Sequence, residues 1–337
     1  MEKGRVMQMK NKFGLLIATL VMVVVIGVIC VMSVGRATED GYTFQIFDFS
    51  FGGSAALRNT IELPAAEVSR LTLEYGSENI VVYPTSDENI TIKEYLYSDS
   101  PEALATVTYP ESNEVVVTGG KVQTIVFFSF GINGGERIEV YVPEKALETL
   151  SLQTGSGNIS GEHDCVTEDG SFTVSAGSGN IKWDGTDAKE VSFKAGSGNI
   201  KVANIKGDIR VQTGSGNISG DFLRGKLSAS AGSGNIALTE FAGSGTVTAK
   251  SGNVNVEAAS VTGDMEMQTG SGNIKLEVPQ ELQFHLEVNT GSGNIKTDFE
   301  DAMSYNEKGN SAEGDVGAAP EISIRLKANS GNVKVID

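Results

Sequence analysis

Three side chains able to bind a metal or act as nucleophiles stand next to one another in this sequence, namely His163, Asp164 and Cys165. A closed zinc site needs a fourth ligand and tetrahedral geometry, but the only other histidine, His285, is far away along the chain. The only other cysteine, Cys30, lies in an apolar segment, so no disulfide is expected. We therefore expect residues 163–165 to form a solvent-exposed loop, and we predict no metal site.

Motifs of the common enzyme classes are missing from the sequence. It contains no phosphate-binding loop, no Gly-x-Ser-x-Gly nucleophile elbow and no His-Glu-x-x-His pair. We predict that the chain is not an enzyme and binds no cofactor. The alternative is a polysaccharide lyase or hydrolase, because that chemistry needs paired carboxylates, or Ca²⁺ with a basic residue, on one face. The sequence identifies no such converging set.

The charge balance restricts the partners. The chain has 26 basic and 43 acidic residues and a net charge of −17, and every acidic residue except Glu2 follows Arg36. Such a field repels nucleic acid, so we predict no nucleic-acid partner. The simplest role of the negative net charge is to keep the protein soluble. The densest acidic cluster, Asp298, Glu300 and Asp301, is a candidate for bridging a divalent cation, but it matches no calcium-binding loop.

Lysines recur at one position of a repeated motif and form a candidate ligand-facing stripe. Each follows an Ile or Val, and strand alternation predicts that all of them point outward; they are Lys182, Lys201, Lys275, Lys296 and Lys334. One interpretation is that they keep the sheet soluble and discourage aggregation. The other is that they bind an anionic wall polymer.

The motif itself is a Ser-Gly-Asn corner, which organises the second half of the chain. Nine copies recur at intervals of 18–22 residues, a spacing typical of a solenoid, except that the last interval is 38 residues and represents two periods or one period plus an insertion. They begin at Gly155, Gly177, Gly196, Gly214, Gly232, Lys250, Gly270, Gly291 and Asn329. Apolar residues alternate with polar ones before each corner, as in Phe172, Val174 and Ala176, and a second short apolar piece follows. This period of two predicts strands with one face inward, and hence an all-β parallel β-helix over residues 150–337.

The corner composition predicts its own geometry. Glycine adopts positive φ freely and asparagine tolerates it, so we expect left-handed backbone at each corner. Equivalent asparagines then lie one strand spacing apart, close enough to hydrogen-bond as a ladder. The predicted ladder contains Asn158, Asn180, Asn199, Asn217, Asn235, Asn253, Asn273, Asn294 and Asn332.

Residues 37–149 differ from the corner repeats and are interpreted as an N-terminal β region, or cap, with early solenoid turns. Turn-forming Pro, Gly and Ser residues separate the expected strands, which lie at 71–75, 80–83, 90–97, 115–118 and 138–142. Asn79 ends a degenerate corner. The apolar run Thr124–Ile132, with Phe127, Phe128 and Phe130, is either cap core or a hairpin tip that touches a membrane or partner.

The N-terminus predicts a membrane anchor. Residues 13–34 form an uncharged apolar run that is long enough to span a bilayer, which needs about 20 residues. Basic residues concentrate in the tail at 1–12, so the positive-inside rule places the tail in the cytoplasm and the rest outside. The competing interpretations are a cleaved signal peptide and, less favoured because Ile29 is large, a lipoprotein. We expect a single-pass cell-membrane protein.

The end of the repeat array predicts a capacity for self-association. Val333 lies close to the last residue, Asp337, so we expect an open final turn with unpaired backbone groups. End-to-end association of copies follows unless the polar insertion Thr297–Pro320 folds over that edge.

The anchor, the strand–SGNI–strand repeat and the stretch Ile138-Glu139-Val140-Tyr141-Val142-Pro143 resemble the bacterial putative-adhesin family of β-strand-repeat domains of unknown function. This resemblance, which runs from about Leu71 to the C-terminus, implies a right-handed β-helix outside a bacterial membrane. It supplies no catalytic residues. We predict a surface-display protein that adheres, binds a cell-wall or surface glycan, or senses envelope stress through a membrane protein partner. A cytoskeletal β-helix polymer would require the opposite topology.

Overall fold

The computed structural model describes residues 55–120 and 135–337, which belong to one compact unit, Ser50–Asp337. These residues form 23 strands and two single-turn 3-10 helices, η1 (Ala65–Glu67) and η2 (Glu300–Ala302), without an α-helix. The all-β prediction is confirmed for this part of the chain. None of these described residues belongs to a helix with the length and apolar character needed to cross a bilayer. The predicted tail, the predicted anchor with Cys30, and the run Thr124–Ile132 lie outside the described residues.

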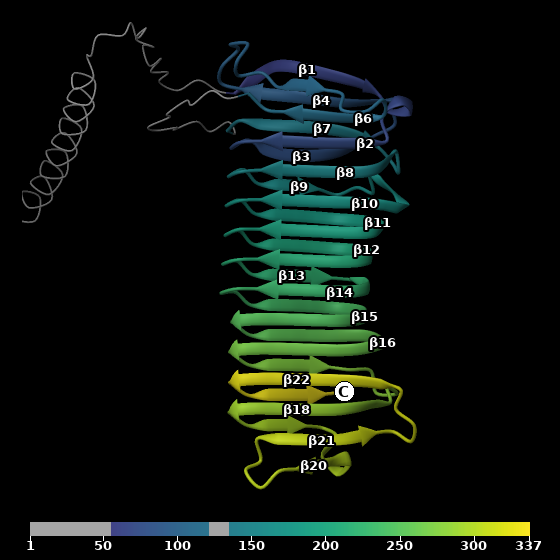
Figure 1. The fold of residues 1–337 in the computed structure, drawn as a ribbon, viewed down its shortest axis with the longest axis vertical. Coiled ribbons are helices and arrows are strands. Elements are labelled where there is room, and N and C mark those ends of the chain that lie inside the picture. The colour runs from purple at the N-terminus through teal and green to yellow at the C-terminus, as the bar shows by residue number, and fades with distance from the viewer. Residues whose placement is uncertain (1–54, 121–134) are drawn as a thin grey trace, which may run out of the picture. The chain divides into compact units, whose positions relative to one another are not determined.

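The strand segments that run into the corners pair side by side in a parallel row, called row A (Figure 1). Each of these segments buries every second side chain, as expected for strands that turn one face toward the core. In spatial order row A contains β6 (Glu114–Thr118), β2 (Arg70–Tyr75), β8 (Leu147–Thr154), β10 (Val166–Ala176), the second parts of β11 (Ile181–Ala195) and β12 (Ile200–Thr213), β14 (Arg224–Ala231), the second parts of β15 (Ile236–Ser251) and β16 (Val254–Ser271), β22 (Ile322–Ser330) and β18 (Phe284–Ser292).

The segments that leave the corners form a second parallel row, called row B. In spatial order it contains β7 (Arg137–Pro143), β3 (Asn79–Thr85), β9 (Ile159–Gly161), the first parts of β11 and β12, β13 (Ile218–Asp221), the first parts of β15 and β16, β17 (Ile274–Glu277), β23 (Val333–Ile336) and β19 (Ile295–Thr297).

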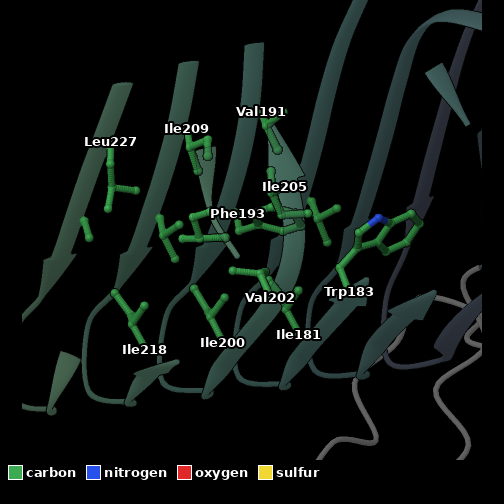
Figure 2. Close-up of a cluster of buried hydrophobic side chains, with 14 of the residues drawn as sticks. Ile181, Trp183, Val191, Phe193, Ile200, Val202, Ile205, Ile209, Ile218 and Leu227 are labelled. Carbon is green, nitrogen blue, oxygen red and sulfur yellow. The ribbon is translucent and has the colours of Figure 1, made fainter. Parts of the chain in front are cut away.

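The core lies between the two rows. Figure 2 shows side chains of row B, such as Ile181 and Ile200, pointing toward side chains of row A, such as Val191 and Phe193. Ile181 pairs in register with Ile200 in row B and Val191 pairs with Ile209 in row A, whereas the register shifts at the bend between Asp187 and Glu190. Each of these side chains is at most 1% exposed, and burial of one contributes about 1.5–3 kcal/mol.

A second bend joins each row B segment to the next row A segment. Here the backbone does enter the left-handed region, at Gly185, Asn204, Phe222 and Glu240, with φ between 52° and 82°. Only the first of these is glycine. Glycine also recurs at this bend, since Gly207, Gly225 and Gly243 pair in register, and the first two of these have φ of 138° and 121°.

Antiparallel strands cover the N-terminal end of the stack. The strand β4 (Asn89–Leu96) pairs with β7, and β1 (Ala56–Pro64) pairs with β4, while β5 (Thr106–Thr108) pairs with β6. The repeat formed by β6 and β7 lies outside the repeat formed by β2 and β3, although it follows it in the sequence. The first repeat is therefore an interior one.

The C-terminal end corrects the expectation of an open final turn. The last strands of the sequence, β22 and β23, lie between β16–β17 and β18–β19, and Figure 1 shows β22 between β16 and β18. The end of row A is β18, which pairs with the antiparallel β21 (Ser311–Val316), and β20 (Met303–Tyr305) pairs with β21. The last two strands, β22 and β23, thus insert between two repeats that precede them in the sequence. The final repeat of the chain is therefore paired on both sides.

Candidate functional site

The corner asparagines lie in one continuous column of hydrogen bonds, the corner ladder. In each step the side-chain Oδ1 of one asparagine accepts the backbone N–H of the next at 2.8 or 2.9 Å. Direct side-chain amide bonds are fewer and longer, as from Asn180 Nδ2 to Asn158 Oδ1 at 3.3 Å. The spatial order is Asn79, Asn158, Asn180, Asn199, Asn217, Asn235, Asn253, Asn273, Asn332 and Asn294.

The expected left-handed backbone at the corners is wrong. None of the corner asparagines has a positive φ, and among the corner glycines only Gly272 and Gly331 do. The reason for glycine is close approach. A Cβ at the second glycine of any corner would lie 1.7–2.1 Å from a carbonyl oxygen of the neighbouring repeat, as at Gly198 against Gly179. That position is glycine in all nine copies, whereas Lys250 and Asn329 occupy the first glycine position.

The five predicted lysines form two separate groups on the outer face of row B. Lys182 pairs in register with Lys201. At the C-terminal end the spatial order is Lys275, Lys334 and Lys296, on three neighbouring strands. Within the described residues, only Lys275 has a carboxylate partner, Glu277 Oε2 at 3.0 Å. The other four side chains are exposed.

The segment His163–Cys165 is not the exposed loop that the sequence predicts. The backbone of Lys145 and Leu147 donates to the carbonyl groups of Asp164 and Cys165, which ties the segment to β8. The Cys165 side chain is 1% exposed, and burial raises the pKa of its thiol. A buried neutral thiol is neither a nucleophile nor a metal ligand, so Cys165 is a core residue.

Ser323, His285 and Asp315 share one level on neighbouring strands of row A and its covering strand β21. The His285 Nδ1 lies 2.6 Å from Asp315 Oδ1, but Nε2 faces Glu313 Oε1 at 3.5 Å. The Ser323 hydroxyl has no hydrogen-bond partner in the described part of the chain. Because the base does not reach the serine, these residues do not form a nucleophilic triad.

The acidic cluster is spread over an exposed segment. Asp298, Glu300 and Asp301 are all exposed at or beside η2. The described residues contain no group of three or more His, Cys, Asp or Glu side chains placed to hold a metal ion. Neither this cluster nor the His163 segment therefore provides a metal centre there.

A buried carboxylate is the main feature that the sequence analysis missed. Glu94 on β4 is 0% exposed and accepts hydrogen bonds from Asn59 Nδ2, the Tyr75 hydroxyl and the Ala105 backbone N–H at 2.7–3.1 Å. Burial and the Glu94 charge raise the pKa of Tyr75. Glu94 thus joins three segments of the cap. Its position was predictable, because Ile90, Ile92 and Leu96 define the inward face of its strand.

Solved structures with low sequence identity resemble the chain in part. A putative adhesin from Parabacteroides distasonis ATCC 8503 is 13% identical, with 84% of this chain and 98% of that chain covered and a TM-score of 0.45. A putative adhesin from Bacteroides fragilis NCTC 9343 is 15% identical, with 85% and 100% covered and a TM-score of 0.43. No curated protein matches the chain. The family model that matches is Toastrack DUF4097, over residues 68–336. The match spans every corner of the ladder, and the chain belongs to the Toastrack DUF4097 family.

Proposed function

We propose that this chain is a non-enzymatic surface-display protein that adheres to an anionic polymer of the cell wall or to a surface glycan. Residues 13–34 anchor it in the cell membrane, and everything after Arg36 lies outside the cytoplasm, as the basic residues of the tail indicate. The two rows are the faces of a right-handed parallel β-helix, since parallel crossover connections are right-handed in about 98% of cases.

The observation that carries this proposal is that Lys275, Lys334 and Lys296 pair in register with one another across three strands. These side chains stand on adjacent strands, about 4.8 Å apart. Like charges placed directly opposite destabilise a sheet. Glu277 already pairs with Lys275, but Lys334 and Lys296 have no carboxylate partner within the described residues. Folding stability alone therefore does not account for these two, whereas an anionic polymer along the face neutralises them.

The background charge strengthens the argument. The chain has a net charge of −17, so its average field repels a polyanion. A local group of lysines is then the place where such a polymer binds. Contacts of this kind weaken as salt rises, because counterions screen exposed charges over about 8–10 Å at 0.1–0.15 M.

The test is co-sedimentation of the full-length chain with purified bacterial wall at low and high salt. We expect retention that falls with salt and is lost in Lys296→Glu/Lys334→Glu. The matched control is Lys194→Glu/Lys327→Glu, which changes the charge equally through exposed lysines of row A. Equal loss in both variants would show that general charge, and not the row B lysines, causes retention.

The same experiment separates the other functions. Oligosaccharides released into the supernatant would identify the chain as a lyase or hydrolase. No retention of the wild-type chain would contradict wall binding and favour a membrane protein partner, as in envelope-stress sensing.

A further inference from the structure

Two tyrosines stack on the outer face of row B at the N-terminal end. The rings of Tyr141 on β7 and Tyr83 on β3 have centroids 5.3 Å apart and planes 26° apart. The ammonium of Lys93 lies 4.6 Å from the Tyr141 ring centroid. We call Lys93, Tyr141 and Tyr83 the tyrosine stack. Its members come from three neighbouring strands, β4, β7 and β3.

Hydrogen bonds hold Tyr141, the central member of the tyrosine stack, in place before any ligand arrives. The Tyr141 hydroxyl donates to Glu139 at 3.1 Å, and Arg137 Nε donates to the same carboxylate at 2.9 Å. The Arg137 guanidinium in turn lies 3.8 Å from the Tyr95 ring centroid. Tyr141 is fixed in this way, and the Tyr83 ring stacks on it. A stacked ring has less freedom to lose when a ligand binds, which favours binding.

The stack has an open side at Tyr83. Lys93 and Tyr83 cover the two sides of Tyr141, but Tyr83 is itself 39% exposed. On its far side β9 ends at Gly161, which is level with Val82, so no β9 residue pairs with Tyr83. The exposed Glu162 directly follows Gly161, and the next outward residue on a strand at this level is Asp184 on β11, two strand spacings or about 9.6 Å away.

Carboxylates border the open side. Glu162 follows the end of β9 and is exposed, and Asp184 is exposed and accepts a hydrogen bond from Asn204 Nδ2 at 2.7 Å. A ring with an apolar face and hydroxyl groups at its edge matches this arrangement. The C–H groups of a pyranose meet the electron-rich face of the tyrosine, and its hydroxyls donate to carboxylates.

We propose that the free face of Tyr83 is a binding subsite for one neutral pyranose ring of a glycan, with Glu162 and Asp184 accepting hydrogen bonds from its hydroxyls. This subsite deepens the proposed function and rests on it. A neutral ring fits better than an acidic one, because both bordering groups are carboxylates. A quaternary ammonium ligand fits less well, since such ligands are recognised by cages of several aromatic faces, and Tyr83 offers one.

The position of the subsite also defines the direction in which a bound glycan would extend. From Tyr83 the outer face of row B leads past β9 to Lys182 on β11 and Lys201 on β12. A glycan with a neutral ring on Tyr83 thus extends toward the first pair of lysines.

The test uses the full-length chain in a detergent without a sugar headgroup, titrated calorimetrically with chitohexaose and cellohexaose. We expect binding of at least one hexamer, a loss of about tenfold or more in Tyr83→Ala, and a change of less than about twofold in Tyr83→Phe, which keeps the ring. The matched control is Tyr305→Ala, because Tyr305 is 43% exposed and lies on β20, at the C-terminal end of the sheet. Thermal melts of all variants establish that they are folded.

Three outcomes would overturn the subsite: no binding of either hexamer, equal affinity in the wild type and Tyr83→Ala, or displacement of the hexamer by tetramethylammonium. Failure of the proposed function looks different, because the wild-type chain would then not sediment with bacterial wall. Wall retention that depends on Lys296 and Lys334, together with an unaffected Tyr83→Ala variant, would reject the subsite alone.

Discussion

The backbone N–H of Asn332 donates to the Oδ1 of Asn273 at 2.8 Å, although Asn294 is the corner asparagine that follows Asn273 in the sequence. Asn294 in turn donates to Asn332 at 2.9 Å. The last repeat of the chain therefore separates two repeats that are consecutive in the sequence. Both β18 and β19 depend on it for their parallel partners.

Truncation after Pro320 should consequently disrupt β18 rather than trim a free end. The truncation removes Leu326 and Val333, which are at most 1% exposed, and each such side chain contributes about 1.5–3 kcal/mol. We expect the amides of Leu286 and Val288 to lose hydrogen-exchange protection. Glu307→Ala, at an exposed position of the turn between β20 and β21, is the control. Unchanged protection in the truncated chain would show that β18 does not need β22.

The second corner glycine should tolerate no side chain. In Gly198→Ala the new Cβ would lie 1.8 Å from the Gly179 carbonyl oxygen, and backbone atoms on both sides must shift. We expect a loss of about 3 kcal/mol or more in the free energy of unfolding, measured by urea denaturation. In Gly185→Ala nothing lies within 4 Å and only the positive φ opposes the change, so the loss should be about 1–2 kcal/mol. Similar losses in both variants would refute close approach as the cause.

The corner ladder should be most sensitive in its interior. Asn199→Ala removes the acceptor of the Asn217 backbone N–H, a bond of 2.8 Å, and should cost about 0.5–1.5 kcal/mol. Asn294 ends the ladder, and within the described residues its Oδ1 accepts no bond from another corner. Asn294→Ala should therefore cost less. Equal midpoints of denaturation for the two variants would mean that the ladder bonds contribute nothing beyond what water supplies.

The sequence predicts the strands of the two rows closely because their alternation is clear, whereas β1, β5, β20 and β21 were not predicted. The expected strands at 71–75 and 115–118 correspond to β2 and β6 within one residue. The order of the repeats was not predictable, since the corners at Asn273, Asn294 and Asn332 share one motif and pair equally well. Nothing local in the sequence distinguishes an interior repeat from a terminal one.

The errors at the candidate site have local physical causes. Polar neighbours suggested that Cys165 is exposed, but at a bend the neighbouring chain at Lys145 and Leu147 pairs with its segment. Glycine suggested positive φ at the corners, while the actual constraint comes from a different repeat, far away in the sequence. The tyrosine stack joins β3, β4 and β7, and it could be anticipated only once their register was known.

The buried Glu94 should stabilise the cap through its full set of acceptors. In Glu94→Gln one oxygen becomes an NH₂ group, which cannot accept from Asn59, Tyr75 or the Ala105 N–H. Leaving a buried donor unpaired costs about 1–3 kcal/mol. The exposed Glu88→Gln is the control. Thermal denaturation followed by circular dichroism should show a clear loss only in Glu94→Gln, and equal curves would contradict this role.

Asp164 should make stability depend on pH. Burial raises the pKa of this carboxyl, while the Asp187 backbone N–H and Lys145 act in the opposite direction. The folded chain therefore binds the proton at higher pH than the unfolded chain, so this residue lowers stability as pH rises from about 3.8 through the folded pKa. Asparagine still accepts the Asp187 N–H but does not ionise. The stability of Asp164→Asn relative to wild type should thus be higher at about pH 7 than at about pH 3. Asp169→Asn, at an exposed site, is the control for removing a surface carboxylate. If the urea midpoints of Asp164→Asn and wild type differ by the same amount at both pH values, burial of a charged Asp164 is contradicted.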